Sequence, residues 1–223
     1  MSLYDDLQAA TKTEAQAFLS VPQLADGLSG RITKAMYIAY LTEAYHHVKH
    51  TVPLMNAAKA RFDQAHAHFA KALDEYIAEE TGHELWILDD ITSCGASADD
   101  ARKSLPRAPT AAMVGYVYDY IAAKNPMGIF GMVFVLEGTS VLLATAGASA
   151  VQKSLGLPPS AFRYLTSHGS LDQDHLKFFE KLMGEVTDPA DKAAIIEVAK
   201  RVFVLFADIF RAIPRAEAPV HAA

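Results

Sequence analysis

Two histidines and an aspartate stand four and three residues apart in the stretch HGSLDQDH. His168, Asp172 and His175 would therefore lie on one face of a helix. The same stripe continues with Phe179 and Leu182, so it is polar at one end and apolar at the other. This change predicts that the imidazoles face the interior, where a metal ion would satisfy them. The alternative is an aspartate paired with two histidines at the start of a helix.

A second pair of ligand-type residues, Glu80 and His83, stands three apart in the stretch YIAEETGHELWILDD. In a continuous helix both would interrupt a stripe that also holds Leu73, Tyr76 and Ile87. Glu-x-x-His at this spacing is the unit with which helical bundles bind two iron or manganese ions. Taken alone, the pair also fits two neighbours on an exposed helix surface.

A lone carboxylate, Glu137, is the only charged residue between Lys124 and Lys153. If it were unpaired inside the protein, its pKa would rise and the group would stay neutral. A cation would keep it ionised, and bridging two metal ions is a natural role for it. The alternative is a neutral carboxyl that is hydrogen-bonded to a neighbouring helix. A set of three imidazoles and three carboxylates suits iron or manganese better than structural zinc.

The segments that carry these residues are predicted to be helical, and none shows the alternation of a strand. Periodicity and Pro or Gly breaks predict about eight helices and an all-α fold. They cover residues 4–19, the stretch from Thr33 to about Pro53, 61–93, 109–126, the apolar stretch up to Lys153, 171–184 and 189–212. One domain is expected over 1–213, and the tail 214–223 is expected to be disordered.

The composition excludes several classes of protein. A net charge of −6 and a pI near 5.8 give no electrostatic signature of nucleic-acid binding. No basic run suits a membrane surface, and the polar N-terminus does not resemble a signal peptide. The apolar stretch around Glu137 is long enough to span a bilayer, but it holds four glycines and is expected to be a buried central helix. A single cysteine excludes an internal disulfide and fits a cytoplasmic protein.

The order of the motifs resembles the haem-oxygenase-like di-iron oxidases and oxygenases, in particular the subfamily labelled iron-containing redox enzymes. That group shares its fold with the thiaminase II (TenA) proteins and the PQQ-synthesis oxidase. The resemblance covers residues 30–185 and is most specific in SHGSLDQDH. It implies a haem-oxygenase-like bundle with metal ligands Glu80, His83, Glu137, His168, Asp172 and His175. Several members place the first glutamate seven residues before the histidine, where this chain has Tyr76, so Glu80 is assigned here with Glu79 as its competitor.

The stretch EAYHHVKH places Glu43, His47 and His50 on one helix face. The resemblance allows an additional ligand or a substrate-facing residue here, and His47 and Glu43 are the candidates. The plainer interpretation is a core helix with a polar rim beside the cavity. Residues expected to do no chemistry are the surface histidines His66 and His68 and the loop cysteine Cys94. Asp89 and Asp90 are expected at an exposed helix end, and the alternative is that they accept hydrogen bonds behind the metal ligands.

The resemblance implies that two iron ions, or manganese, activate O2 and that a small organic substrate is oxidised in an apolar cavity. The expected partners are this substrate, O2 and an unidentified electron donor, with no nucleic acid and no membrane; a homodimer is expected by analogy. One alternative is a metal-free TenA-like hydrolase, which needs a cysteine nucleophile in the central helix. Others are a haem oxygenase and a non-catalytic small-molecule-binding or regulatory protein.

Overall fold

The computed structural model describes residues 2–215, and within this range all side chains except those of residues 170–174. The described residues form twelve α-helices and three 3-10 turns, and they contain no strand. The prediction of an all-α fold is therefore confirmed. The α-helices are α1 (Leu3–Ala10), α2 (Lys12–Leu19), α3 (Pro22–Leu28), α4 (Lys34–Val48), α5 (Thr51–Lys59), α6 (Ala67–Glu80), α7 (His83–Ser93), α8 (Ala98–Lys103), α9 (Ala108–Ala123), α10 (Ile129–Leu155), α11 (Arg163–Gly184) and α12 (Pro189–Arg211).

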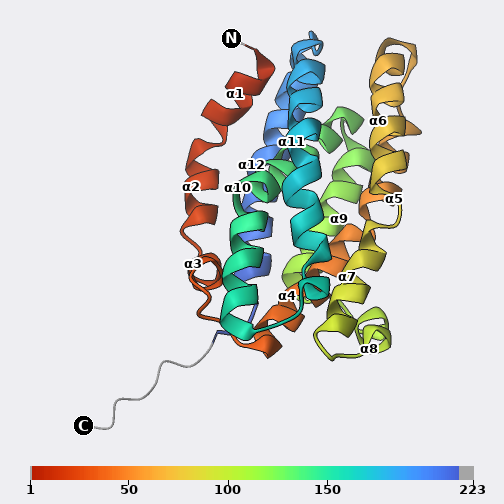
Figure 1. Ribbon diagram of the computed structural model, residues 1–223. Coiled ribbons are helices and arrows are strands. Elements are labelled where there is room, and N and C mark those ends of the chain that lie inside the picture. The colour runs from red at the N-terminus through yellow and green to blue at the C-terminus, as the bar shows by residue number, and fades with distance from the viewer. Residues whose placement is uncertain (1, 216–223) are drawn as a thin grey trace.

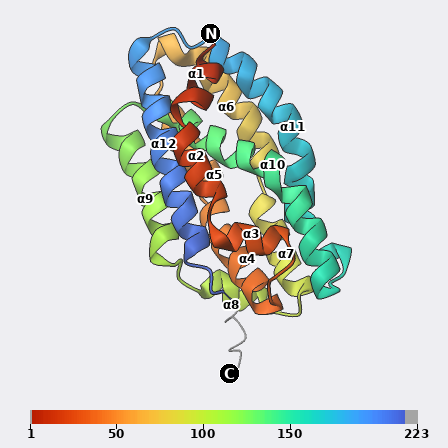
Figure 2. The same ribbon diagram turned by 90° about the vertical axis from the view of Figure 1, so that its left-hand side faces the viewer.

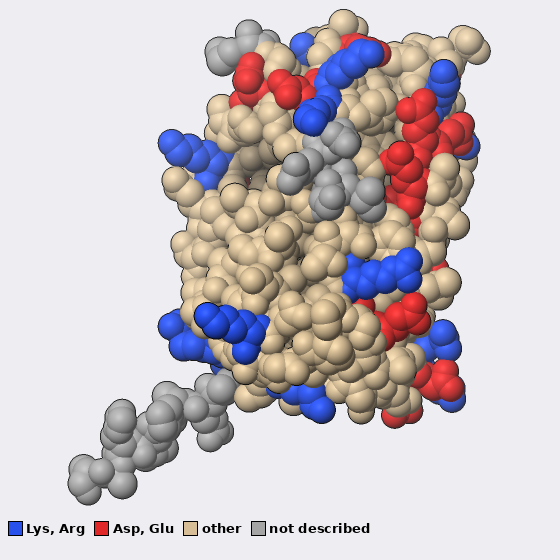
Figure 3. Space-filling model, viewed as in Figure 1, with Lys and Arg blue, Asp and Glu red and all other residues tan. Residues whose placement is uncertain are grey.

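The long helices run side by side and form an elongated bundle, with α1 to α3 along one side (Figures 1 and 2). α10 packs most extensively against α11 and α12, while α4 packs against α7. On the face seen in Figure 3, acidic side chains gather at the upper right, over α6, and at the upper left, near α1, and the basic ones are scattered over the face. This face therefore offers no concentrated positive charge.

α10 is buried throughout over its first part, residues 129–135, whereas much of its second half is partly or fully exposed. Together with the turn before it, Pro126–Leu155, it is long and apolar enough to cross a membrane. Its most apolar window has a mean hydropathy of 1.9, but 67% of that window is buried inside the protein. Gly131 lets α12 approach closely, because a Cβ there would lie 2.4 Å from the carbonyl oxygen of Ile195. Such burial is typical of a core helix in a helical domain.

The helices outnumber the predicted eight because the chain breaks inside predicted helices. The opening helix divides at Thr11, whose hydroxyl donates to a backbone carbonyl one turn earlier. Pro53 does not kink or end α4; it lies in the first turn of α5, where a proline needs no helical N–H partner. Residues 22–28 and 98–103, for which no helix was predicted, form the short helices α3 and α8.

The C-terminal end of α12 is attached to α3. Gln23 Nε2 donates to the carbonyl oxygen of Arg211 at 3.0 Å, and Arg215 Nε donates to Asp26 Oδ2 at 2.7 Å. The prediction of a disordered tail over 214–223 falls largely outside the described residues. Because α3 contributes to the lining of a cavity that is described below, these contacts hold part of its wall in place.

Candidate metal centre

Glu80 and His83 meet at a break between two helices. Glu80 is the last residue of α6 and His83 the first of α7, so the single helix predicted for 61–93 is wrong. Gly82, between them, has φ 93°, a backbone conformation that favours glycine and terminates helices. His83 Nδ1 nevertheless lies 3.2 Å from Glu80 Oε2. The turn, and not a shared helix face, brings the pair together.

His168 completes a first group of ligand-type atoms with this pair. Its Nε2 lies 3.1 Å from His83 Nδ1 and 3.9 Å from Glu80 Oε2. Its Nδ1 lies 2.9 Å from the carbonyl oxygen of Tyr164, which can only accept a hydrogen bond, so the proton belongs on Nδ1. The Nε2 lone pair then points to His83 and Glu80, which is the tautomer that a metal ligand needs.

A second group contains Glu80, Glu137 and His175, whose ligand atoms all lie within 4.8 Å of one another. His175 Nδ1 is 3.4 Å from Glu137 Oε1, and its Nε2 is 2.5 Å from Glu79 Oε2. Glu80 belongs to both groups, so the geometry gives it the shared position that the sequence suggested for Glu137. The side chain of the remaining predicted ligand, Asp172, lies outside the described residues.

The five side chains of the two groups are buried, with exposed fractions of 4 to 9%: Glu80, His83, Glu137, His168 and His175. Burial acts to raise the pKa of Glu80, but the neighbouring imidazoles of His168 and His83 outweigh it and lower the pKa to about 2. The ionised carboxylate of Glu80 therefore lies beside His83 Nδ1 and His168 Nε2. These two nitrogens face each other, so only one of them can carry a proton. Buried imidazole and carboxylate donors that converge in this way fit an iron or manganese ion.

Two other candidate residues lie beside or away from the cluster. The ring of Tyr76 contacts that of His175 edge to face, with centroids 5.7 Å apart. Glu43 is turned to the start of α9, where its Oε2 accepts hydrogen bonds from the backbone N–H of Arg107 at 3.1 Å and the hydroxyl of Thr110 at 2.5 Å. Glu43 therefore fixes α9 and is not part of either group of ligand atoms.

A cavity of about 190 Å³, partly open to the surface, adjoins the cluster. Glu80, Glu137 and His168 form part of its wall, and His47 lies on the wall as well. Most of the other lining residues are apolar and come from α2 to α5 and from α10 to α12. An organic molecule in this cavity would thus lie next to the candidate ligands.

Asp90 is a supporting residue that the sequence reasoning misplaced. It was expected at an exposed helix end, but it is fully buried and accepts hydrogen bonds from the backbone N–H groups of Arg163 at 3.0 Å and Tyr164 at 2.9 Å. Burial raises its pKa to about 6, although these bonds act in the opposite direction. Its spacing from His83 and Ile87, seven and three residues, would have placed it on their inward face. Asp90 caps α11 and so links α7 to it.

Comparison with known proteins agrees with this architecture. The family model described as iron-containing redox enzyme matches residues 38–206. A domain of unknown function with a haem oxygenase-like fold from Shewanella denitrificans OS217 is 26% identical, with a TM-score of 0.86 over 94% of this chain and 90% of that chain. A TenA homologue from Pseudomonas syringae pv. tomato DC3000 is 10% identical, with a TM-score of 0.76 over 93% of this chain and 90% of that chain.

Haem oxygenase-1 from the cyanobacterium Synechocystis sp. PCC6803, solved in complex with haem, is 15% identical, with a TM-score of 0.74 over 95% of this chain and 91% of that chain. No curated protein matches the sequence significantly. The fold is thus haem-oxygenase-like and TenA-like, as the motifs led us to expect. Because the family model spans most of its length, this chain belongs to the iron-containing redox enzyme family.

Proposed function

We propose that this protein is a non-haem oxidase or oxygenase that uses two iron ions and O2 to oxidise a small organic molecule. The observation that carries the proposal is the position of Glu80, a buried carboxylate within ligand distance of two separate histidine-containing groups. Paired metal sites in helical bundles use carboxylates and histidines from facing helices. The family to which the chain belongs supports iron as the metal.

In this proposal one ion is held by Glu80, His83 and His168, and the other by Glu80, Glu137 and His175. When bound, two ferrous ions would supply two electrons for the reduction of O2. The rest of the task belongs to the protein. The carbonyl of Tyr164 fixes the orientation of the His168 ring. The apolar cavity walls exclude water and leave space for the substrate next to the ligands.

A metal-free TenA-like hydrolase is less well supported. A cysteine nucleophile would have to face the cavity, and the only cysteine, Cys94, is buried at the end of α7 and is not part of the described cavity lining. Burial raises the pKa of its thiol to about 11, which disfavours the reactive thiolate. A metal-free binding domain is the alternative that the following experiment distinguishes.

The single tryptophan provides a direct readout of metal binding. Trp86 stacks on the ring of His83 with centroids 3.9 Å apart, so a metal ion on His83 should change its fluorescence. Anaerobic titration with Fe(II), monitored by Trp86 fluorescence, is expected to saturate at about two ions per chain. Mixing with O2 should then give a transient visible absorption band in stopped flow.

The variant Glu137→Ala should lose the transient band, whereas the matched variant Glu75→Gln, on the exposed side of α6, should retain it. Saturation at one ion would contradict the two-iron proposal. If the wild-type protein took up no iron at all, the oxidase would be abandoned in favour of a metal-free binding domain.

A further inference from the structure

The three histidines of the stretch EAYHHVKH have different surroundings. His46 Nε2 lies 2.8 Å from the hydroxyl of Ser104, and His50 Nδ1 lies 3.3 Å from the hydroxyl of Tyr118. His47 makes no hydrogen bond or ion pair with any residue that the structure describes. Of the three, only His47 borders the cavity.

His47 is well buried, with an exposed fraction of 7%, and its Nδ1 has neither solvent nor a described partner. Its ring contacts Phe206 edge to face, with centroids 5.8 Å apart. A buried polar group without a hydrogen bond is unfavourable and needs an explanation. Nε2 is not among the buried atoms without a partner, and the ring lies on the cavity wall, so a molecule bound in the cavity can reach this side of the ring and hydrogen-bond to it.

The charges around His47 define the chemistry of this molecule. Burial, together with His168, His50 and His46, lowers the pKa of His47 to about 3, so the ring is neutral at pH 7 and can donate one hydrogen bond and accept another. The described lining of the cavity contains no lysine or arginine that could balance an anion. A hydroxyl or carbonyl oxygen is therefore a better partner than a charged group.

The rest of the cavity indicates what this oxygen is attached to. Its wall is largely apolar, and prominent members are Met36, Leu136, Leu143, Phe206, Phe210 and Ile213. His47 lines the same cavity as the candidate ligands His168, Glu80 and Glu137, so the oxygen would lie in the space that these ligands face. We propose that His47 is a substrate-binding residue that hydrogen-bonds an uncharged hydroxyl or carbonyl oxygen of an otherwise apolar substrate. That the bound molecule is a substrate rests on the proposed function, whereas the binding of an uncharged oxygen by His47 does not.

The test compares matched probes on the purified full-length chain treated with a chelator. Nile red, an uncharged dye, is displaced with 1-octanol, with 1-chlorooctane and with octanoate. The alcohol is expected to bind about tenfold more tightly than the chloroalkane, as one hydrogen bond allows. His47→Phe should abolish this preference, His47→Gln should restore part of it, and His50→Phe should leave it intact.

An unchanged preference in His47→Phe, equal affinities in the wild type, or no displacement would each overturn the proposal. Tightest binding of octanoate, lost in His47→Phe, would overturn the assignment of an uncharged group. Fe(II) titration of His47→Phe should match the wild type, and a loss of iron there would make His47 a metal ligand instead. If the wild type takes up iron but does not prefer the alcohol, only the role inferred for His47 is contradicted. If it prefers the alcohol but takes up no iron, only the proposed function is contradicted.

Discussion

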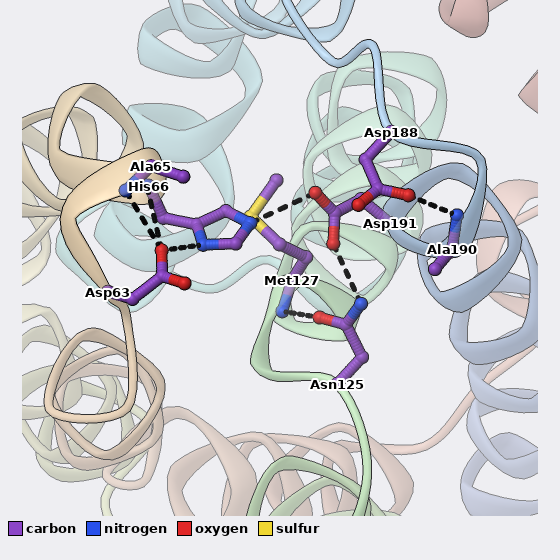
Figure 4. Close-up of polar contacts among 8 residues, drawn as sticks. All are labelled: Asp63, Ala65, His66, Asn125, Met127, Asp188, Ala190 and Asp191. Atoms are coloured by element: carbon purple, nitrogen blue, oxygen red, sulfur yellow. Dashed lines mark hydrogen bonds and ion pairs between the residues drawn. The ribbon is translucent and has the colours of Figure 1, made fainter.

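The cluster of Asp63, His66, Asn125 and Asp191 and the candidate metal centre contain similar residue types but arrange their atoms differently. In the first, which we call the closed cluster, His66 Nδ1 lies 2.7 Å from Asp63 Oδ1 and Nε2 lies 3.0 Å from Asp191 Oδ2 (Figure 4). Asn125 Nδ2 donates to the other oxygen of Asp191 at 2.7 Å. The imidazole ring separates its two carboxylate partners, so the ligand-type atoms do not converge.

In the candidate metal centre the atoms converge instead. Two imidazole nitrogens, from His83 and His168, lie 3.1 Å apart and share the carboxylate of Glu80. The closed cluster satisfies its members within the protein and joins α12 to the segments before α6 and α10. The difference shows that residue type and burial do not identify a metal site; the directions of the donor atoms do.

The largest effect is expected from Glu80→Gln, which should weaken the binding of both iron ions. Loss of a partner outside the ligand shell already costs about 10- to 100-fold in metal affinity, so loss of a shared ligand should cost more than about 100-fold. Fe(II) titration monitored by Trp86 fluorescence measures the iron affinity, and Glu75→Gln is the control on the same helix. Retention of one tightly bound ion by Glu80→Gln would show that Glu80 is not shared.

Metal binding should stabilise one cluster only. With Mn(II) at about 100 times its Kd, the metal-free protein should gain about 2.7 kcal/mol in the free energy of unfolding. Urea denaturation with and without Mn(II) measures this gain. His66→Gln should show the same gain, because the ligand-type atoms of the closed cluster do not converge on one point, and Glu80→Gln should show little. An equal gain in Glu80→Gln would mean that the ion binds elsewhere.

The smallest effect concerns the pH dependence of the closed cluster. Burial acts to lower the pKa of His66, but hydrogen bonds to Asp191 and Asp63 outweigh it and raise the pKa above its usual value. Protonation therefore favours the folded state, and this stabilisation is complete below about pH 6.5 and is lost as pH rises through the folded pKa. Unfolding of His66→Gln at pH 6 and pH 8.5 should show a cost that is larger at pH 6, by about 1 kcal/mol or less.

Asn125→Ala is the control for this pH dependence, because it removes a neutral hydrogen-bond donor from Asp191. Its cost should be about 1 kcal/mol at both pH values. A cost of His66→Gln that did not change with pH would indicate that His66 contributes packing and not charge.

Sequence periodicity was sufficient to predict the all-α class and to predict which face of each long helix points to the interior. Glu137, His168 and His175 stand on such helices, and the structure brings them near Glu80. The break at Gly82 was missed because an apolar stripe appeared to continue across it. A prediction that treats one helix at a time identifies the residues on each helix face, but it is weak where a site is built from the ends of helices.

Contacts between distant segments could not be read from local patterns. His66 was expected on the surface, and its bond to Asp191 joins residues 125 positions apart. Asp90 likewise accepts from backbone groups more than seventy residues later in the chain. Such bonds depend on how the helices pack, and no periodicity within 61–93 contains that information.

The cap that Asp90 provides has a consequence for how the centre is loaded with metal. α7 carries His83 at its start and Asp90 further along, and Asp90 binds the first turn of α11, the helix that carries His168. The two histidines are therefore held in register by the protein alone. In the proposed iron enzyme, an ion could therefore leave and another bind without a change in how α7 and α11 are placed relative to each other.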